Sequence, residues 1–288
     1  MLHLRSRRAG YRCFCLLLAI VTAFSAWFSH PVLAQGVLQR MLMQGVEVIQ
    51  LSTLSPAHEM RMGQQIQAQM LRQGMRLYPD PALNRYISRI GQRLVAVSDR
   101  PRLAHRFQVI RDPKVNAFAT MGGFVYVTTG LLLAADNEAQ LASVLAHEIG
   151  HVNGRHLIGQ MRQVAIARGL ITAVGLEDNT AVNLGTELVL RRPRSRQDEF
   201  DADQRGVRLL SRAGYAESAM PIFLSKLMTA RTLPAFFSTH PAVADRVTAL
   251  EQLIEQDGNP GCTTDSQRVT CGLDDAAYQE YMRKYLKA

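Results

Sequence analysis

The sequence predicts an α+β domain that is mostly helical and holds one small β-sheet. Apolar residues recur at helical spacing along most of the chain after residue 55, whereas only three short runs between residues 107 and 128 have the pattern of strands. The chain contains no internal repeat and no low-complexity tract. Hydrophobic residues make up 47% of the chain and charged residues 20%, which is normal for a globular domain.

The first 34 residues are typical of an export signal. Four arginines precede an apolar run from Cys13 to Phe28, and Ala34 offers a small residue for cleavage. The run is short for a settled membrane span, which needs about 20 apolar residues, and an uncleaved anchor is the alternative. We therefore expect an exported chain that works in the periplasm or cell envelope.

Cap residues indicate where the helices begin. Ser55 and Asp80 each precede a proline, which favours the first turn of a helix, and Asp136 precedes the next long apolar stripe. The two weak helices between residues 157 and 190 suit a lid or a membrane-facing flap. The expected helices span residues 55–76, 80–94, 136–156, two stretches within 157–190 that include the apolar run 163–176, and residues 196–213, 216–230 and 241–256.

Three short runs have the alternation of strands, and the first is Phe107–Ile110. The other two, Asn116–Ala119 and Phe124–Thr128, are joined through Gly122 and Gly123, which favour the tight turn of a hairpin. The sheet therefore comes just before the helix expected over residues 136–156.

The domain is expected to span residues 35–258, followed by a tail over residues 259–288. Cys262 and Cys271 are the two cysteines that remain once the signal is removed. In an oxidising compartment we expect them to form a local disulfide, with two free thiols as the alternative. No stretch after residue 258 is long enough for a helical repeat array, which needs about three repeats of about 34 residues.

The charge of the chain argues against a nucleic-acid partner. The formal net charge is +9, but four arginines belong to the signal, which leaves 29 Lys and Arg against 24 Asp and Glu. This small excess, without a long basic run, is weak for binding nucleic acid. It is compatible with work near an anionic membrane surface.

The segment His147-Glu148-Ile149-Gly150-His151 carries the clearest chemistry. Two histidines four residues apart share one face of a helix, so their imidazoles can bind one zinc ion. Glu148 projects beside them and can take a proton from an attacking water, whose pKa zinc lowers towards about 7. The alternative is a helix with two unrelated histidines, but the motif stands inside a capped, amphipathic pattern.

A catalytic zinc ion needs a third protein ligand and an open fourth position. His156 follows Gly154 by two residues, where a known zinc-binding pattern has three, and this favours a solvated or supporting role for it. Glu199 is the better candidate ligand. Asp203, four residues later on the same helix face, would accept the far ring N–H of a ligand histidine. An ordinary acidic helix face is the alternative for both carboxylates.

Four segments carry a family resemblance, in this order: Asn116–Ala119, Gly122–Leu131, Leu145–His156 and Ser195–Asp203. Together they resemble the HtpX/BepA-type, CAAX-prenyl-protease-related family of zinc metallopeptidases, and the likeness covers about residues 55–255. Met121 stands where the family usually has Pro before the Gly-Gly pair, which bears on the hairpin and not on the chemistry.

The resemblance implies a zincin-like fold of the gluzincin type. It implies one Zn2+ ion per chain, bound by His147, His151 and Glu199, with Glu148 as the general base.

The strand made of Asn116, Ala117, Phe118 and Ala119 resembles the edge strand of the family. An exposed edge beside the zinc would hold a peptide substrate as an added strand, and the alternative is a plain core strand.

His240 is the last candidate catalytic residue. It precedes Pro241, which suits the first turn of the next helix, so a capping role is the alternative. In related enzymes such a histidine lies near the zinc, where it would stabilise the oxyanion of the transition state or close the fourth zinc position as a brake. Arg246, one turn further on, would support it or be solvated.

The expected function is that of an exported zinc endopeptidase that cuts polypeptides, by family analogy misfolded or misassembled envelope proteins. One alternative is a chaperone-like assembly factor that keeps the zinc site but cuts little. Another is a structural metal domain, which would unfold when its metal is removed.

Overall fold

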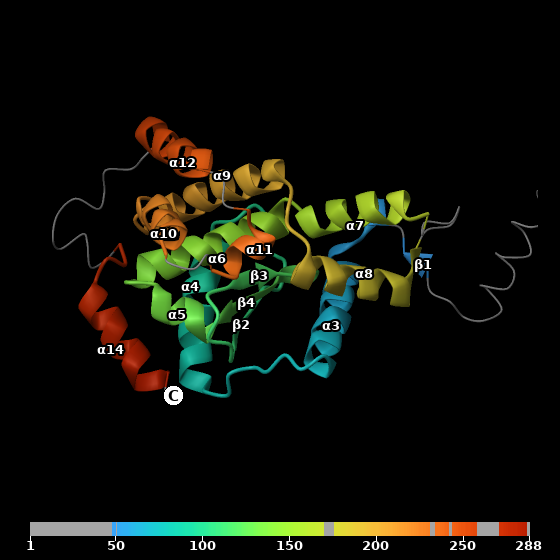
Figure 1. Cartoon of the computed structure of the whole chain (residues 1–288), viewed down its shortest axis with the longest axis horizontal. Helices are drawn as coiled ribbons and strands as arrows, with labels where there is room; N and C mark the ends of the chain where they lie inside the picture. The colour runs from blue at the N-terminus through green and yellow to red at the C-terminus, as the bar shows by residue number, and fades with distance from the viewer. Residues whose placement is uncertain are drawn as a thin grey trace, which may run out of the picture. The chain divides into compact units, whose positions relative to one another are not determined.

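The computed structural model describes residues 48–49, 51–169, 176–230, 234–241, 244–257 and 271–286 (Figure 1). The chain divides into two compact units, Met1–Val48 and Ile49–Ala288, and nearly all described residues belong to the second, which is the one described below. The predicted signal and Cys262 lie outside the described residues, so the signal and the disulfide stay predictions.

The second unit is mostly helical and holds a small three-stranded sheet, which confirms the predicted α+β class. The strands are β2 (Arg106–Ile110), β3 (Ala117–Ala119) and β4 (Phe124–Thr128), in the order β2-β4-β3. β2 pairs parallel with β4, and β3 pairs antiparallel with β4, with Phe118 opposite Tyr126. β3 is therefore an edge strand of this sheet.

The predicted hairpin between β3 and β4 is confirmed. Its turn is the 3-10 helix η2 (Met121–Gly123), in which Gly122 and Gly123 have φ angles of 73° and 83°. These angles favour glycine, and a Cβ on Gly122 would also lie 2.5 Å from the carbonyl oxygen of Glu59. Met121 in place of proline is accommodated, because its side chain is buried in the core.

Helix α6 (Glu138–Asn153) carries the histidine motif and occupies the centre of the unit. It contacts the sheet on one side and α9 (Arg196–Ala213) on the other, as Figure 1 shows. Every residue from 139 to 152 is buried. Polar side chains on this helix therefore need partners inside the protein, because water cannot satisfy them.

The predicted cap of this helix, Asp136, was wrong by one residue, and its predicted end, His156, by three. Asn137 is the cap, and its side chain accepts a hydrogen bond from the backbone N–H of Gln140 at 3.0 Å. Asp136 instead binds the Lys226 ammonium group at 2.6 Å. At the other end Arg155 has a φ of 55°, which breaks the helix before α7 (His156–Ala167) begins.

The other helices pack around this centre. α3 (Pro56–Arg72) and α4 (Pro81–Ala96) begin at the predicted prolines, after caps at Ser55 and Asp80. The remaining elements are β1 (Val48–Ile49), η1 (Leu51–Thr53), α5 (Thr129–Ala134), β5 (Leu176–Glu177), α8 (Asp178–Arg191), α10 (Ala219–Met228), α11 (Phe236–Thr239), α12 (Ala244–Asp257) and α14 (Asp275–Tyr285).

The C-terminal part forms a helix that the sequence analysis did not predict. α14 buries Tyr278 and Met282 in the main hydrophobic cluster, and its Tyr285 carbonyl accepts a hydrogen bond from the Tyr78 hydroxyl at 2.8 Å. The short helices α5 and α11 were missed as well, and α10 is shorter than the predicted 216–230.

The described parts of the segment between residues 157 and 190, α7 and α8, pack as a layer of the unit. α7 and α8 contact each other, and α8 also contacts α3. Met161 of α7 and Leu188 of α8 share a second hydrophobic cluster with Ile66 of α3. The predicted helix over 163–176 is α7 only as far as Ala167, and residues 170–175 lie outside the described part.

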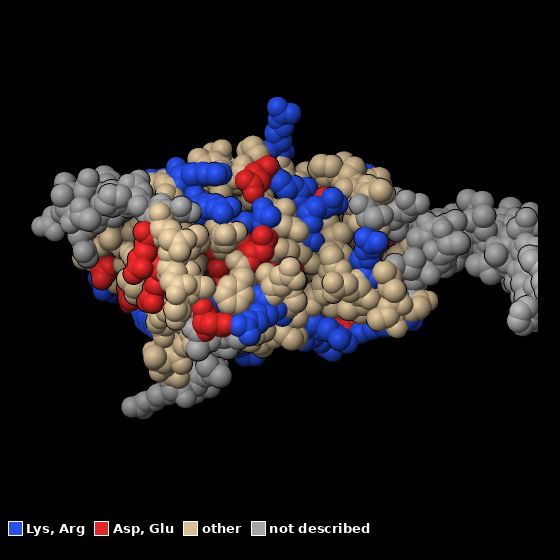
Figure 2. All heavy atoms as spheres, turned by 90° about the horizontal axis from the view of Figure 1, so that it is seen from above, with Lys and Arg blue, Asp and Glu red and all other residues tan. Residues whose placement is uncertain are grey.

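The surface carries interspersed charges. On the face drawn in Figure 2, Lys and Arg side chains lie between Asp and Glu side chains. Within the described residues, no helix combines the length and the apolar character needed to cross a bilayer.

Two glycines allow α6 and α9 to pack closely. A Cβ on Gly150 of α6 would lie 2.7 Å from the carbonyl oxygen of Ala202 of α9. A Cβ on Gly206 of α9 would lie 2.6 Å from Cε of Met220 and 3.2 Å from the backbone nitrogen of His147. A side chain at residue 150 would therefore push α9 away from the histidine motif.

Replacing Gly150→Ala is expected to lower the free energy of unfolding by about 1–3 kcal/mol, because the added methyl group meets backbone that must move. Urea denaturation measures this loss. The matched control is Gly159→Ala, an exposed helical glycine whose Cβ would meet no atom within 4 Å, so its effect is neutral or stabilising by up to about 1 kcal/mol. Equal effects of the two changes would contradict the close packing.

Candidate metal centre

Helix α6 brings His147, Glu148 and His151 to one buried place. One helical turn separates the two imidazoles, and their Nε2 atoms lie 3.0 Å apart. Their side chains are at most 4% exposed, and Glu148 is fully buried. The face-sharing expected from the spacing is present in the structure.

Helix α9 adds Glu199 and Asp203, which are four residues apart and point to the same histidines. Glu199 Oε1 lies 3.3 Å from His151 Nε2, and Glu199 Oε2 lies 3.6 Å from His147 Nε2. Asp203 Oδ1 lies 2.8 Å from the other ring nitrogen of His147, Nδ1. The two carboxylates thus approach His147 from opposite sides of its ring.

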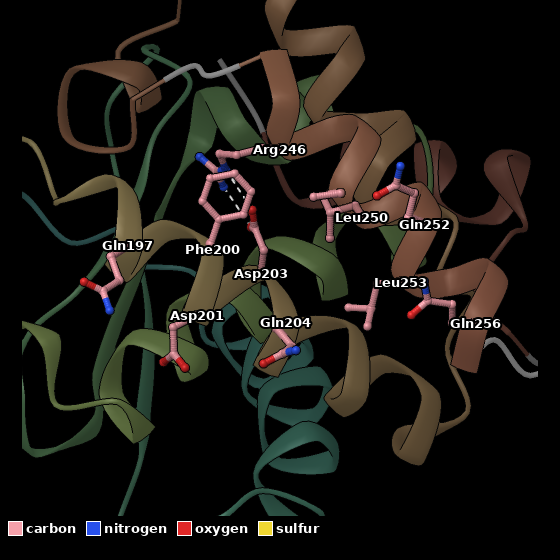
Figure 3. Close-up of a pocket in the computed structure, with 11 residues that line it drawn as sticks. Gln197, Phe200, Asp201, Asp203, Gln204, Arg246, Leu250, Gln252, Leu253 and Gln256 are labelled. Atoms are coloured by element: carbon pink, nitrogen blue, oxygen red, sulfur yellow. Dashed lines mark hydrogen bonds and ion pairs between the residues drawn. The ribbon is translucent and has the colours of Figure 1, made fainter.

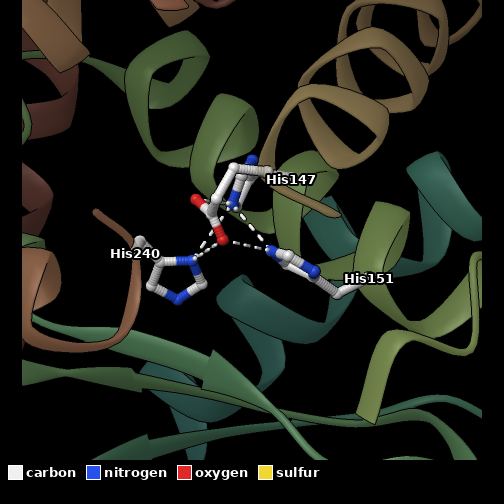
Figure 4. Close-up of side chains that lie close together, drawn as sticks. His147, His151 and His240 are labelled. Atoms are coloured by element: carbon white, nitrogen blue, oxygen red, sulfur yellow. Dashed lines mark hydrogen bonds and ion pairs between the residues drawn. The ribbon is translucent and has the colours of Figure 1, made fainter. Parts of the chain in front are cut away.

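His240 completes the group from a distant part of the chain. It follows α11, and its fully buried ring places Nδ1 3.2 Å from Glu199 Oε1 and Nε2 3.3 Å from Glu148 Oε1. Figure 4 shows the rings of His147, His151 and His240 turned towards one point. The backbone placement differs from the expectation, because His240 ends α11 and residues 242–243, before α12, lie outside the described part.

The partner of His147 fixes which of its nitrogens carries the proton. Asp203 is a carboxylate that only accepts hydrogen bonds, so Nδ1 of His147 must be the N–H that donates to it. In the neutral ring the lone pair is then on Nε2, the atom that faces His151 and Glu199. This is the arrangement that a metal-binding histidine needs.

A chain of two hydrogen bonds fixes the tautomer of His151 in the same way. His156 Nε2 lies 3.0 Å from Asp201 Oδ2, so His156 donates from Nε2 and accepts on Nδ1. His156 Nδ1 lies 2.8 Å from His151 Nδ1, which is therefore the donor. The lone pair of His151 is left on Nε2. His156 is buried at 8% exposure, so the solvated role considered for it is wrong, and it supports His151 instead.

When both rings are neutral, the two Nε2 lone pairs face each other at 3.0 Å, which is repulsive unless a proton or a metal cation lies between them. One ligand atom from each of four buried side chains falls within 4.8 Å of all the others, and the four residues are His147, His151, Glu199 and His240. Imidazole nitrogens with one carboxylate oxygen suit a transition metal of the zinc type. The residues present therefore fit a metal ion.

Protons compete with a cation for these nitrogens. Burial disfavours the charged form of His147, but hydrogen bonds and charges from Asp203 and Glu199 outweigh it and raise its pKa to about 9. Burial lowers the pKa of His151 well below its ordinary value. Burial would raise the pKa of Glu199, yet the charge of His240 and the close approach of the three histidine rings hold it well below its usual range. A cation must displace the proton of His147, so its affinity rises with pH.

Arg246 is the functional neighbour that the sequence analysis left undecided between support and solvation. Its guanidinium is buried and donates to both oxygens of Asp203, from Nε at 2.7 Å and from Nη2 at 2.8 Å. Its Nη1 donates to Glu199 Oε2 at 2.7 Å. One cation thus orients both carboxylates. Burial would raise the pKa of Asp203, but its hydrogen bonds with His147 and Arg246 keep it below its usual value.

A cavity of about 440 Å³ lies between α9 and α12 beside this pair, and Figure 3 shows Asp203 and Arg246 at its wall. Phe200, Leu250 and Leu253 also line it. The four ligand candidates are absent from its lining, so this cavity reaches the supporting pair and not the metal centre itself.

Glu148 has unused bonding capacity in this centre, as has Nε2 of His240. Within the described part of the chain, neither of its carboxylate oxygens has a hydrogen-bond partner, although both are buried. His240 Nε2 is close, but its approach at 3.3 Å lacks the alignment of a hydrogen bond. A buried carboxylate in this condition is ready to accept a proton from a molecule that enters the site.

The predicted substrate strand lies at the sheet edge, but Ala117, Phe118 and Ala119 are all buried, so in this arrangement the edge is covered and not exposed as expected. Thr120 donates its N–H to Phe124 O at 2.8 Å, and Thr128 donates to Asn116 O at 3.0 Å, so the even-numbered residues of this strand turn towards β4. The backbone groups of Ala117 and Ala119 therefore point to the free edge, and those of Phe118 and Asn116 do not. Asn116 itself precedes β3.

The chain is similar in sequence to known peptidases. A model of peptidase family M48 matches residues 81–254. The chain is 36% identical over 196 residues to the putative beta-barrel assembly-enhancing protease of Vibrio cholerae, covering 62% of this chain and 40% of that one. With the beta-barrel assembly-enhancing protease of Escherichia coli strain K12 it shares 35% identity over 213 residues, or 68% and 44%.

A mitochondrial protein is also similar to this chain. The mitochondrial metalloendopeptidase OMA1 of Schizosaccharomyces pombe is 34% identical over 182 residues, covering 59% of this chain and 53% of that protein. The chain therefore spans about half, or less, of the length of these relatives.

Replacing Arg246→Met is expected to lower the free energy of unfolding of the metal-depleted protein by about 3–5 kcal/mol, because two buried carboxylates lose their cation. Urea denaturation in a chelator measures it. Arg196→Met is the control, since Arg196 pairs with Asp245 across the same two helices, α9 and α12, but in solvent, where the loss stays below about 1 kcal/mol. Similar losses for the two variants would contradict the bridging role of Arg246.

Proposed function

The chain belongs to peptidase family M48, whose model matches more than half of its 288 residues, and from this premise we propose that it is a zinc-dependent endopeptidase. The observation that carries the proposal is the pair of inward-facing Nε2 lone pairs on His147 and His151, with Glu199 beside both. Two separate sets of hydrogen bonds, between His147 and Asp203 and between His151 and His156, hold these tautomers, and such support is typical of a metal site.

His147, His151 and Glu199 would hold the ion, one per chain. Zinc bound there supplies a Lewis acid that polarises a peptide carbonyl and lowers the pKa of water towards about 7. Asp203 and His156 keep the two imidazoles oriented, and Arg246 keeps Glu199 and Asp203 charged. The proton transfers of the reaction are carried out by side chains of the protein.

Glu148 is proposed as the general base. Its oxygens are buried and without hydrogen-bond partners among the described residues, so the proton of an attacking water is the hydrogen bond that it lacks. The same carboxyl group would then deliver that proton to the leaving amine, which keeps the nitrogen from departing as an anion.

His240 is proposed to act as a brake in the arrangement described here. A catalytic zinc site keeps one position open, yet a ring nitrogen of His240 lies within 4.8 Å of the other three ligand atoms, where it would close that position. The metal-binding side chains are almost fully buried, so a peptide reaches them only after the segment with α11 and His240 moves. Stabilisation of the oxyanion is the second role considered for His240.

Polypeptides are the proposed substrates, held as an added strand on the free edge of β3. The names of two relatives connect them with assembly of beta-barrel proteins, and the leader-like first 34 residues suggest export. We therefore propose misfolded or misassembled envelope proteins as the natural substrates and the periplasm as the location. A chaperone-like factor with little proteolysis is the competing function.

Glu148→Gln is expected to retain one zinc ion per chain and to lower the rate of casein cleavage by about 100-fold or more, because it removes the base and leaves the ligands. Zinc content by mass spectrometry and cleavage of labelled casein measure the two effects. Equal handling of a client protein by Glu148→Gln and wild type would favour the chaperone function.

Glu199→Ala is the companion variant and is expected to lose the zinc ion together with the activity. Its control is Asp198→Ala, which removes a neighbouring, more exposed carboxylate of α9 and should leave zinc content unchanged. Zinc and activity that survive in Glu199→Ala would overturn the assignment of the third ligand. Unfolding on metal removal would point to a structural metal domain.

His240→Ala is expected to retain zinc and to raise the initial rate of casein cleavage severalfold, because the closing ligand is gone while the three others stay. Rates are compared per bound zinc ion. A rate that falls at unchanged zinc content would contradict the brake and support the oxyanion role.

A further inference from the structure

Arg194 is a buried cation next to the metal centre that the proposed reaction does not use. It lies in the loop between α8 and α9 and is 6% exposed. Among the described residues, no carboxylate forms an ion pair with it. Burial lowers the pKa of its guanidinium, and the negative charges of Glu148, Glu199 and Asp198 only partly oppose this.

Two hydrogen bonds tie Arg194 to the sheet edge and to the segment that ends in His240. Its Nη2 donates to the carbonyl oxygen of Ala119 at 3.3 Å, and its backbone N–H donates to the carbonyl oxygen of Thr239 at 2.9 Å. The remaining terminal nitrogen, Nη1, is buried and has no partner among the described residues. A buried donor left in this condition is costly, so it calls for an acceptor.

The contact between Arg194 and the end of β3 indicates what kind of acceptor would fit. Ala119 is the last residue of β3, and its carbonyl points to the free edge, like the backbone groups of Ala117. At the other end of the same edge, Val115 O accepts the N–H of Phe236 of α11 at 2.9 Å. Arg194 therefore lies at the end of β3, beyond which a strand added along this edge would find no further backbone groups of β3 to pair with.

We propose that Arg194 is a substrate-positioning residue, whose Nη1 donates a hydrogen bond to one backbone carbonyl of the bound peptide. This inference rests on the proposed endopeptidase function and concerns how the substrate is set in register. The planar guanidinium offers two parallel donors, so Nη2 holds the last carbonyl of β3 and Nη1 takes the next carbonyl, that of the substrate.

The space beside the guanidinium agrees with this. Arg194 lines a small cavity together with Ala119, Thr120 and His151. Its volume is about 10 Å³, which is room for roughly one oxygen-sized group. A carbonyl that enters there lies between the end of the edge strand and a proposed metal ligand, so the hydrogen bond sets which peptide bond faces Glu148.

The competing explanation is that Arg194 merely braces the edge strand and α11. A brace stabilises the protein whatever peptide is bound, whereas a positioning residue acts on a single peptide bond. The test therefore compares peptides that lack one carbonyl at a time.

The probe is the β-casein octapeptide that binds zinc-loaded Glu148→Gln protein most tightly. Each of its peptide bonds is replaced in turn by an ester, which keeps the carbonyl, or by a trans-alkene, which lacks it. With Glu148→Gln, one position is expected to show about 10-fold weaker binding of the alkene than of the ester, measured by fluorescence anisotropy. In Glu148→Gln/Arg194→Met this difference should fall below about twofold at that position only.

The control is Arg93→Met in the same background, because Arg93 Nη2 also donates to a backbone carbonyl, that of Gly214 at 3.4 Å, but from an exposed position on α4. It should leave the pattern of peptide positions unchanged. Arg194→Lys, which keeps the charge and loses the fork, should also lose the position-specific difference while its zinc content and thermal unfolding stay near those of the parent.

The inference is overturned if the difference in binding between alkene and ester peptides is the same at every position in Glu148→Gln and in Glu148→Gln/Arg194→Met. It is also overturned if none of the octapeptides binds. Either result assigns Nη1 to a water molecule only and leaves Arg194 as a brace. The proposed function has a separate readout, because wild-type protein that does not cleave casein refutes it even when the position-specific binding is present.

Discussion

The close packing of α6 against α9 is the constraint on which the whole centre depends. Gly150 of α6 lies against the carbonyl of Ala202, and Ala202 stands between Glu199 and Asp203 on α9. Because these two carboxylates are one helical turn apart, the contact delivers both of them to His147, one to each ring nitrogen. A wider separation of the helices would move a ligand and its support away together. Close packing of the two backbones therefore determines where the side chains of the centre lie.

Electrostatic balance is the second condition. Glu148, Glu199 and Asp203 are three buried carboxylates, and Arg194 and Arg246 are the two buried guanidinium groups near them. Buried charges of one sign are costly unless cations accompany them, so a divalent ion bound here would complete the balance and would leave a slightly positive site. Such a site favours the negative charge that develops on a peptide carbonyl during attack. The arginines thus allow a carboxylate-rich site to act on a neutral substrate.

The parts of the site that sequence could predict are those set by local geometry. The spacing of His147 and His151, and of Glu199 and Asp203, places each pair on one helix face whatever the tertiary structure is. His156 could not be interpreted in this way, because the left-handed turn at Arg155 folds it back onto His151. Arg194, Arg246 and α14 depend on contacts between distant segments, and neither periodicity nor caps report such contacts. Polar partners that only tertiary packing brings together could therefore be identified only from the structure.

Access to the centre and binding of a peptide are linked through the edge of β3. In the described arrangement, Phe236 of α11 donates to Val115 O at one end of this edge, and Arg194 holds both Ala119 O at the other end and Thr239 O, just before His240. Moving His240 away from the ligands pulls on these same hydrogen bonds. An added peptide strand offers the edge equivalent partners, so exchange of α11 for substrate costs few net hydrogen bonds. If β3 binds the peptide and His240 is the brake, as we propose, the edge that binds the peptide also retains the brake, and occupancy by one would disfavour the other.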